Sequence, residues 1–355
     1  MKFVFMTDLH GRANNPISRK DFFPDTILKK CEWVVNYANQ MDAVILCGGD
    51  WLQRPDTSPN FIASLAKILM KARRGVYSVL GNHDIYSYNI DSFTRTPLYL
   101  LFACGIIKLL TNKPTVFAGE DGKYIEVTGV SSHPMLDKNH ETKDYVLKGR
   151  EMRDDTFKIH VVHGFLANKK WPDQVPHTLI DDTTEENCAD VILTGHEHSG
   201  YNVIEKETSV SGNTHFITYC NPGSLARVTA GVGDMRDDVR IALIDNNAVC
   251  KVSLISVPCK KAEDVLDREK LVEEKKQSHS IEAFAVKLAN IQNADAEDTV
   301  RYSSAIEMLT EYVKKIRENG EAAEWVTDEI VKLATEVLTQ SEEQMAESRK
   351  RRRSE

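Results

Sequence analysis

Residues 43–50 read Ala-Val-Ile-Leu-Cys-Gly-Gly-Asp, five mostly apolar residues followed by two glycines and an aspartate. A run that ends abruptly in such a cluster is typical of a buried strand followed by a tight loop. Similar runs lie on either side of it, at Phe3–Thr7 and Val76–Leu80. The segments between the three runs, Thr26–Gln40 and Phe61–Ala72, carry apolar residues at helical spacing. This alternation predicts a parallel or mixed sheet covered by helices.

Later in the chain, further apolar runs follow one another with fewer helical segments between them. They are Tyr124–Thr128, Lys158–Val162, Val191–Thr194, His215–Tyr219 and Val239–Asp245. We therefore predict an α/β protein in which two sheets lie face to face and helices flank them.

Polar clusters follow five of the predicted strands directly. They are Asp8-Leu9-His10, Gly48-Gly49-Asp50, Gly81-Asn82-His83-Asp84, His163-Gly164 and Gly195-His196-Glu197-His198. Each cluster alone can be read as a turn or a solvated pair. Ligands of open α/β sheets gather at the carboxyl ends of strands, so we expect all five clusters to converge. Carboxylate, amide and imidazole groups together suit two divalent ions, with Mn²⁺ expected first and Fe²⁺, Zn²⁺ or Mg²⁺ as alternatives.

The same five clusters resemble the signature motifs of the calcineurin-like metallophosphoesterases. The resemblance implies a two-sheet sandwich over residues 1–258, with a site for two metal ions that Asp50 bridges. One ion would be held by Asp8, His10, Asp50 and His198. The other would be held by Asp50, Asn82, His163 and His196.

The resemblance also implies two catalytic residues that do not bind metal. His83 would face the scissile phosphate and donate a proton to the leaving alkoxide or bind a phosphate oxygen. Asp84 would lie behind His83 as its orienting partner. The segment 221–227 resembles a Gly-Ser-x-x-Arg element that follows the last metal motif in many members of the family.

The chain changes character near residue 260. Residues 261–355 contain no proline, a single glycine, 16 Lys+Arg and 22 Asp+Glu. Apolar residues recur at helical spacing on either side of Gly320, which predicts a helical hairpin. We expect residues 259–299 to form a connector or reduced cap, and 300–355 to form the hairpin with a basic tail. The hairpin either packs on its own domain or docks a partner.

A phosphoesterase domain followed by a helical segment resembles the SbcD-type nucleases. That resemblance implies a DNA exonuclease or endonuclease subunit in DNA end processing, recombination or repair. The partners it implies are DNA, an SbcC-type SMC-like ABC ATPase bound through the C-terminal helices, and a second copy in a homodimer. The alternatives are a small-molecule or cyclic-nucleotide phosphodiesterase and, third, a protein phosphatase or a noncatalytic binding protein.

Basic and aromatic residues in the loops after the motifs suit a polymeric substrate. They are Arg12, Arg19, Lys20, Arg54, Tyr86, Tyr88, Phe93, Arg95, Lys169, Lys170 and Trp171. The alternative interpretation is ordinary surface loops with some core aromatics.

The net charge of −8 argues against a protein that simply coats nucleic acid. Residues 261–355 account for −6 of it, however, and two divalent ions would add positive charge at the site itself. The longest apolar stretch, 99–110, is too short for a bilayer, and we see no signal peptide. Seven scattered cysteines suit a reducing compartment. We therefore expect a cytoplasmic protein without membrane contact.

Overall fold

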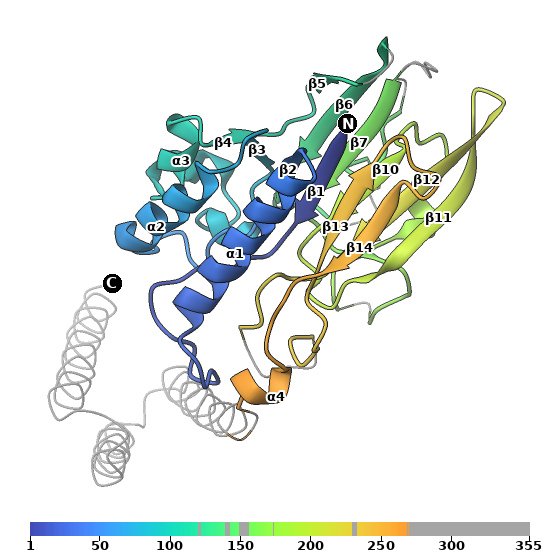
Figure 1. The fold of residues 1–355 in the computed structure, drawn as a ribbon. Helices are drawn as coiled ribbons and strands as arrows, with labels where there is room; N and C mark the ends of the chain where they lie inside the picture. The colour runs from blue at the N-terminus through green and yellow to red at the C-terminus, as the bar shows by residue number, and fades with distance from the viewer. Residues whose placement is uncertain are drawn as a thin grey trace, which may run out of the picture. The chain divides into compact units, whose positions relative to one another are not determined.

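Two six-stranded sheets lie face to face in the computed structural model of the protein, with helices on the outer face of the first sheet (Figure 1). The structure describes residues 1–119, 122–138, 143–148, 156–172, 174–228, 233–267 and 269. They belong to the unit Met1–Leu271. The predicted sandwich is confirmed.

The first sheet has the order β14-β13-β1-β2-β3-β4. Its strands are β1 (Lys2–Met6), β2 (Ala43–Cys47), β3 (Val76–Ser78), β4 (Ile107–Leu109), β13 (Arg240–Asp245) and β14 (Val252–Ser256). Strands β1 to β4 run parallel, with Phe3 opposite Val44 in the register of β1 and β2. Strand β13 pairs antiparallel with β1, so the N-terminal strand lies inside the sheet.

The second sheet has the order β11-β12-β10-β7-β6-β5. Its strands are β5 (Thr115–Ala118), β6 (Tyr124–Val130), β7 (Thr156–Val162), β10 (Val191–Thr194), β11 (Tyr201–Val210) and β12 (Asn213–Asn221). The four central strands are parallel, and the two edge strands, β5 and β11, are antiparallel to their neighbours.

Few helices accompany the sheets. They are α1 (Phe23–Gln40), α2 (Pro59–Leu69), α3 (Tyr99–Ala103) and α4 (Ala262–Val265), with 3₁₀ turns at η1 (Asn82–Asp84), η2 (Ile90–Arg95) and η4 (Ile180–Thr183). A small ribbon pairs β8 (Leu166–Ala167) with β9 (Thr178–Leu179). Helix α1 begins with a proline and an acidic residue in its first turn, both of which favour a helix start.

The alternation of side chains along β1 shows how the layers are built. Phe3 and Phe5 point between the two sheets, where they pack with residues of the second sheet such as Val161. Val4 and Met6 point the other way, toward α1 and α2. Because both faces of the strand are buried, β1 is apolar throughout, as expected for a parallel sheet covered on both sides.

Within the part of the expected connector that the structure describes, α4 ends at Val265. The connector beyond it and the hairpin of residues 300–355 lie outside the described residues. Among the described helices, none has the length and apolarity to cross a membrane. All seven cysteines are free thiols, and Cys31, Cys47, Cys188 and Cys220 are buried.

Candidate metal centre

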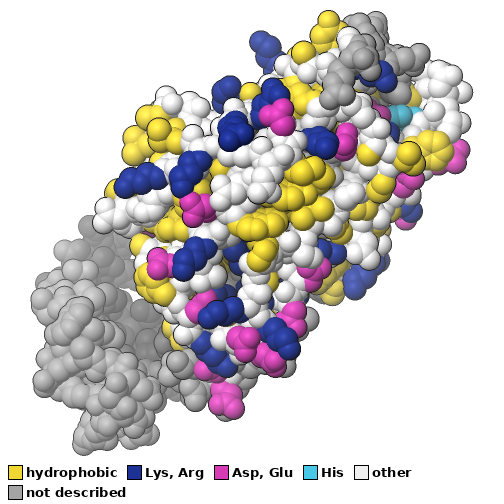
Figure 2. All heavy atoms as spheres, viewed as in Figure 1, with side chains coloured by type: hydrophobic (Ala, Val, Ile, Leu, Met, Phe, Trp, Pro, Cys, Tyr) yellow, Lys and Arg dark blue, Asp and Glu magenta, His cyan; other side chains and the backbone are white. Residues whose placement is uncertain are grey.

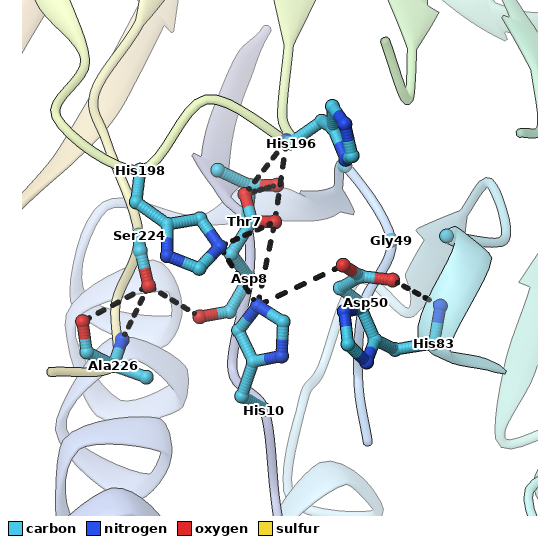
Figure 3. Close-up of polar contacts among 12 residues, drawn as sticks. Thr7, Asp8, His10, Gly49, Asp50, His83, His196, His198, Ser224 and Ala226 are labelled. Carbon is cyan, nitrogen blue, oxygen red and sulfur yellow. Dashed lines mark hydrogen bonds and ion pairs between the residues drawn. The ribbon is translucent and has the colours of Figure 1, made fainter. Parts of the chain in front are cut away.

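All five predicted polar clusters converge at one edge of the sandwich. Asp8, Asp50 and Asn82 follow β1, β2 and β3 of the first sheet, whereas His163 and His196 follow β7 and β10 of the second. Their side chains surround one small volume, as Figure 3 shows for those on β1, β2 and β10. Both sheets therefore contribute to the same site.

A first group of ligand-type atoms comes from Asp8, His10 and His198, and these atoms all lie within 4.8 Å of one another. Nε2 of His10 is 3.0 Å from Nε2 of His198. Each of these nitrogens is also 3.8 Å from Oδ1 of Asp8. Two imidazoles and a carboxylate at such spacing match a divalent cation site.

A second group comes from Asp50, His163 and His196, again within 4.8 Å. Nε2 of His163 is 3.2 Å from Oδ1 of Asn82 and 3.5 Å from Oδ2 of Asp50. The same Oδ2 is 3.7 Å from Nε2 of His10, which belongs to the first group. Asp50 thus lies between the two groups, where the resemblance implies a bridging carboxylate, and it forms a third group of ligand-type atoms with His10 and His83.

The backbone at the site is held in an uncommon conformation. Asp8, His10, Asp50 and His196 have φ angles of 54°, 46°, 52° and 74°. Positive φ is rare outside glycine, and Asp and His are enriched among the exceptions. Such residues cost of order 1–3 kcal/mol each and persist where the surroundings enforce them. Here the amides of Asp8 and His10 donate to the carbonyls of Gly49 and Asp50, which ties the loops after β1 and β2 together.

Two of the loop glycines are required by close packing. A methyl group at Gly81 would overlap Oδ1 of Asp50, and one at Gly195 would overlap Oγ1 of Thr7. Neither position has a positive φ. The requirement is therefore for space next to the carboxylates, as the sequence predicts for a crowded metal loop.

Hydrogen bonds around the site fix the orientation of its side chains. Nδ1–H of His163 donates to the carbonyl of Gly48 at 2.6 Å, which turns Nε2 of the ring toward Asp50. Oγ1 of Thr7 donates to Oδ2 of Asp8 at 2.6 Å, and the amide of His196 donates to both oxygens of Asp8. These are the surrounding contacts that keep a ligand set in place.

The segment 221–227 supports the loop after β1 through hydrogen bonds to its backbone. Oγ of Ser224 donates to the carbonyl of Asp8 at 2.9 Å (Figure 3). The amide of Leu225 donates to the carbonyl of Thr7. Arg227 points away from the metal ligands, with its buried guanidinium on the carbonyls of Arg236 and Lys260. The Gly-Ser-x-x-Arg element thus acts here through its serine and backbone.

The charges of the site are strongly coupled. Burial lowers the pKa of His10 to about 3 and also lowers the pKa of His196, so both rings are neutral. Burial alone would raise the pKa of Asp50, but the charged ring of His163, which also hydrogen-bonds to this carboxylate, outweighs burial and holds that pKa below its usual range. Burial opposes protonation of His163 too, yet the Asp50 carboxylate raises its pKa to about 10. A bound metal must displace that proton, because a ligating imidazole is neutral.

His83 and Asp84 differ in their surroundings from the prediction. Nδ1–H of His83 donates to the carbonyl of Gln53 at 2.9 Å, so a backbone group orients the ring. The carboxylate of Asp84 accepts instead from the amides of Gly81 and Leu52. Burial, with the nearby Asp50 charge, raises the pKa of Asp84 to about 8. Asp84 closes the turn that carries His83, and its role as an orienting partner stays a prediction.

Two groups that contact the candidate site residues were not predicted from the sequence. Oδ1 of Asp234 lies 3.9 Å from Nδ1 of His198, on the side of the ring opposite the site. The carbonyl of Gln53 orients His83. No motif marks Asp234, and a backbone carbonyl carries no signature in the sequence.

The residues present fit divalent metal ions. Neutral imidazoles, an amide oxygen and a shared carboxylate form the donor set of a borderline divalent cation. Nδ1 of His10 is buried and has no hydrogen-bond partner among the described residues. Nε2 of the same ring lies 3.8 Å from Oδ1 of Asp8 and 3.7 Å from Oδ2 of Asp50, so Nε2 is the nitrogen that would bind a metal ion.

Only some of the loop residues that were predicted to surround the site face it. Arg19 is buried and bonded to Asp21, and Phe93 is buried beside α3, so neither faces a substrate. Tyr88 lines a hollow of about 440 Å³ that opens onto His163 and His196. On the face shown in Figure 2, the described basic and acidic side chains are mixed rather than gathered in one stripe.

Comparison with known proteins agrees with this geometry. The sequence profile of the calcineurin-like phosphoesterase family matches residues 1–200. Among solved structures, TT1561 of Thermus thermophilus is similar at 14% identity, covering 72% of this chain and 99% of that chain with a TM-score of 0.41. A second crystal structure is similar at 16% identity, with the same coverages and a TM-score of 0.39. No curated protein matches the sequence.

Proposed function

The chain belongs to the calcineurin-like phosphoesterase family, and from this premise we propose that it is a metal-dependent phosphodiesterase that cleaves DNA. The observation that carries the proposal is the position of Asp50 between two groups of ligand-type atoms. Two adjacent sites fit a phosphodiester, whose attacking and leaving oxygens can each lie beside one cation.

We assign Asp8, His10, Asp50 and His198 to one ion, and Asp50, Asn82, His163 and His196 to the other. When bound, the two ions would neutralise phosphate charge and lower the pKa of water for attack on phosphorus. The identity of the metal is part of the proposal, with Mn²⁺ first.

His83 would supply the proton for the leaving group. Its backbone amide donates to Oδ1 of Asp50 and its Nδ1–H to Gln53, so Nε2–H is the group left for the substrate. As water attacks phosphorus, the bond to the leaving alkoxide breaks and that oxygen takes the proton from Nε2. The ring of His83 packs edge-on against that of His10, with centroids 4.9 Å apart, which places it directly beside the ligands.

A polymeric substrate is supported by the surface next to the site. Phe165 lines both the hollow beside His163 and His196 and a second hollow, whose lining includes Lys169, Trp171 and Arg240. A cyclic or small phosphodiester is the second candidate, since the first hollow alone, at about 440 Å³, has the size of a small-molecule site.

The test is a direct comparison of substrates in Mn²⁺ and in EDTA. Single- and double-stranded DNA, a 2′,3′-cyclic nucleotide and bis(p-nitrophenyl) phosphate are incubated with the full chain. We expect metal-dependent DNA cleavage that is lost in Asp50→Ala. Rapid turnover of the cyclic nucleotide without any DNA cleavage would establish the second candidate instead.

We further propose an SbcC-type SMC-like ATPase as partner, bound through residues 300–345, which lie outside the described residues. The proposal is supported by the helical spacing of apolar residues on either side of Gly320. Co-purification with a co-expressed ATPase of this class should be lost when residues 300–345 are deleted, while hydrolysis of bis(p-nitrophenyl) phosphate remains. Retention of the ATPase by the deleted chain would contradict the docking role.

A further inference from the structure

Phe165 separates two hollows at the edge of the metal centre. The first, of about 440 Å³, contains His163 and His196 in its wall. The second, of about 550 Å³, is lined by Lys169, Trp171 and Arg240 among others. Phe165 lines both, so a ligand that extends from the metal centre into the second hollow must pass its ring.

Phe165 belongs to a small aromatic group. Its ring centroid is 5.2 Å from that of Trp171 and 6.2 Å from those of His177 and His196. Phe165 and Trp171 are half-buried, and both line the second hollow. Part of each ring is therefore open to a flat partner, while the rest is packed.

A buried carboxylate fixes the backbone at Phe165. Oδ2 of Asp137 accepts from the Phe165 amide at 2.6 Å. Its Oδ1 accepts from the hydroxyls of Tyr145 and Thr178, at 2.6 and 2.8 Å. Three donors on one buried carboxylate leave the loop little freedom to move. The position of Phe165 relative to His163, two residues earlier, is thus set in advance.

The position of Trp171 is fixed in a similar way. Its amide donates to Nε2 of His177 at 3.1 Å, while Nδ1–H of His177 donates to the carbonyl of Val175 at 2.7 Å. Both ring nitrogens of His177 are therefore used to hold the segment that carries Trp171. The backbone at both aromatic residues is therefore held in place before any ligand binds.

The second hollow is charged so as to receive an anion. Lys169 is exposed and lines this hollow and a smaller neighbouring one, and Arg240 lies across from it. The acidic residue in the wall, Glu197, has its carboxylate oxygens on the amides of Ser199 and Gly200. Its charge is turned into the loop, which leaves Lys169 to act on a ligand. Arg240 also donates to Oδ1 of Asn202 and lies 3.7 Å from the carboxylate of Asp238.

We propose that Phe165 and Trp171 are the stacking surface for bases of a single DNA strand next to the scissile phosphate. Lys169 and Arg240 contact the backbone of the same strand in the second hollow. Aromatic rings accept any base by stacking, and cations follow the phosphates, which is how single strands are bound without sequence preference. The inference rests on the proposed function and names the substrate: an oligonucleotide fills both hollows, whereas a mononucleotide needs only the first.

The test measures binding and cleavage separately, in the full chain. Binding of a fluorescent single-stranded octadeoxynucleotide is followed by anisotropy in EDTA, so that no cleavage occurs. Phe165→Leu and Trp171→Leu should each weaken binding by about 5- to 100-fold, the range measured for loss of one stacked base. Phe165→Tyr, which keeps the ring, should bind like wild type. Phe216→Leu is the matched control, because Phe216 is exposed on β12 and lines neither hollow.

Lys169→Gln tests the second hollow. The slope of log affinity against log salt should fall by about one for the octamer. In Mn²⁺, kcat/KM for the octamer should fall in Phe165→Leu and in Trp171→Leu and should stay at the wild-type value in Phe216→Leu.

The outcomes separate the two proposals. Octamer cleavage by wild type, with Phe165→Leu and Trp171→Leu binding like wild type, overturns the stacking surface and leaves the nuclease proposal standing. Absence of any oligonucleotide cleavage by wild type overturns the nuclease proposal. In that case the anisotropy measurement still decides the inference, since binding that the two leucine variants do not weaken, or no binding at all, overturns it.

Discussion

His83 contacts the metal centre through both its backbone and its ring, and these contacts can be separated. The amide donates to Oδ1 of Asp50, whereas Nδ1–H of the ring donates to the carbonyl of Gln53. His83→Ala keeps the amide, so we expect metal content near two ions per chain while kcat falls by about 10²- to 10⁴-fold, the usual contribution of a general acid. Metal analysis beside steady-state kinetics checks this. Loss of both ions would mean that His83 is a ligand.

Gly81 provides space for the bridging carboxylate. In Gly81→Ala the new methyl would displace Oδ1 of Asp50. We expect metal affinity to fall by about 10- to 100-fold, as for other changes that disturb the support of a ligand. Isothermal titration with Mn²⁺ measures the loss.

Gly75→Ala is the control for Gly81→Ala. Gly75 has a φ of +85° and lies before β3, so alanine there should cost stability without touching the site. Equal losses of metal affinity in the two variants would show that lowered stability, not crowding of Asp50, is the cause.

At the scale of residues, the sequence predicts which side chains meet but not all that holds them. Asp8, Asp50 and His163 each follow an apolar run, and that pattern is visible because strand ends are marked by residue type. The contact of His83 with the carbonyl of Gln53 cannot be predicted in this way, because every residue has a backbone carbonyl and residue type does not show which one accepts. The turn-closing position of Asp84 depends on the local backbone path for the same reason.

Helix α1 carries a buried lysine whose effect on stability should depend on pH. Nζ of Lys30 donates to the carbonyl of Leu225 at 2.8 Å, and burial, with the nearby charge of Arg227, lowers its pKa from 10.5 to about 7. Between those values the unfolded chain holds a proton that the folded chain has released, so this contribution to stability rises with pH. It is lost as the pH falls toward 7.

Lys30→Met removes this dependence. Relative to that variant, wild type should gain about 1–3 kcal/mol in its free energy of unfolding between pH 7 and pH 9.5. Urea unfolding at the two pH values measures it. Lys29→Met, at the exposed neighbouring position, is the control. Relative to Lys29→Met, wild type should show no such gain in its free energy of unfolding between the two pH values. If the free energy of unfolding changed by the same amount in wild type and in Lys30→Met between the two pH values, the prediction would be contradicted.

At the scale of elements, the central strands are the predictable ones. β2 and β10 are predicted with the bounds that the structure shows, because strands buried on both faces are continuously apolar. The edge strand β11 was not predicted, since its half-exposed residues include Glu205, Lys206 and Glu207. The stretch 99–110 divides into α3 and β4 because Gly105, with a φ of +70°, turns the chain between them.

For the whole molecule, the metal ions should act as a link between the two sheets, because the ligands follow strands of both. An ion that binds only the folded chain stabilises it by about 2.7 kcal/mol at a concentration 100 times its dissociation constant. We expect Mn²⁺ to raise Tm in wild type and not in Asp50→Ala, measured by calorimetry with EDTA as reference. An equal rise in both proteins would place the ion elsewhere.

The place of β1 in the first sheet has a consequence for folding during synthesis. β1 is made before the other strands of both sheets, yet it lies between β2 and β13, and residues 240–245 leave the ribosome only after every strand of the second sheet. Leu225 and Ala226, whose amides bind the carbonyls of Thr7 and Asp8, also arrive late. Contacts so distant in sequence form slowly. During translation the edge of β1 that pairs with β13 must therefore stay unpaired until β13 has been made. The first sheet cannot form strand by strand in the order in which its strands leave the ribosome.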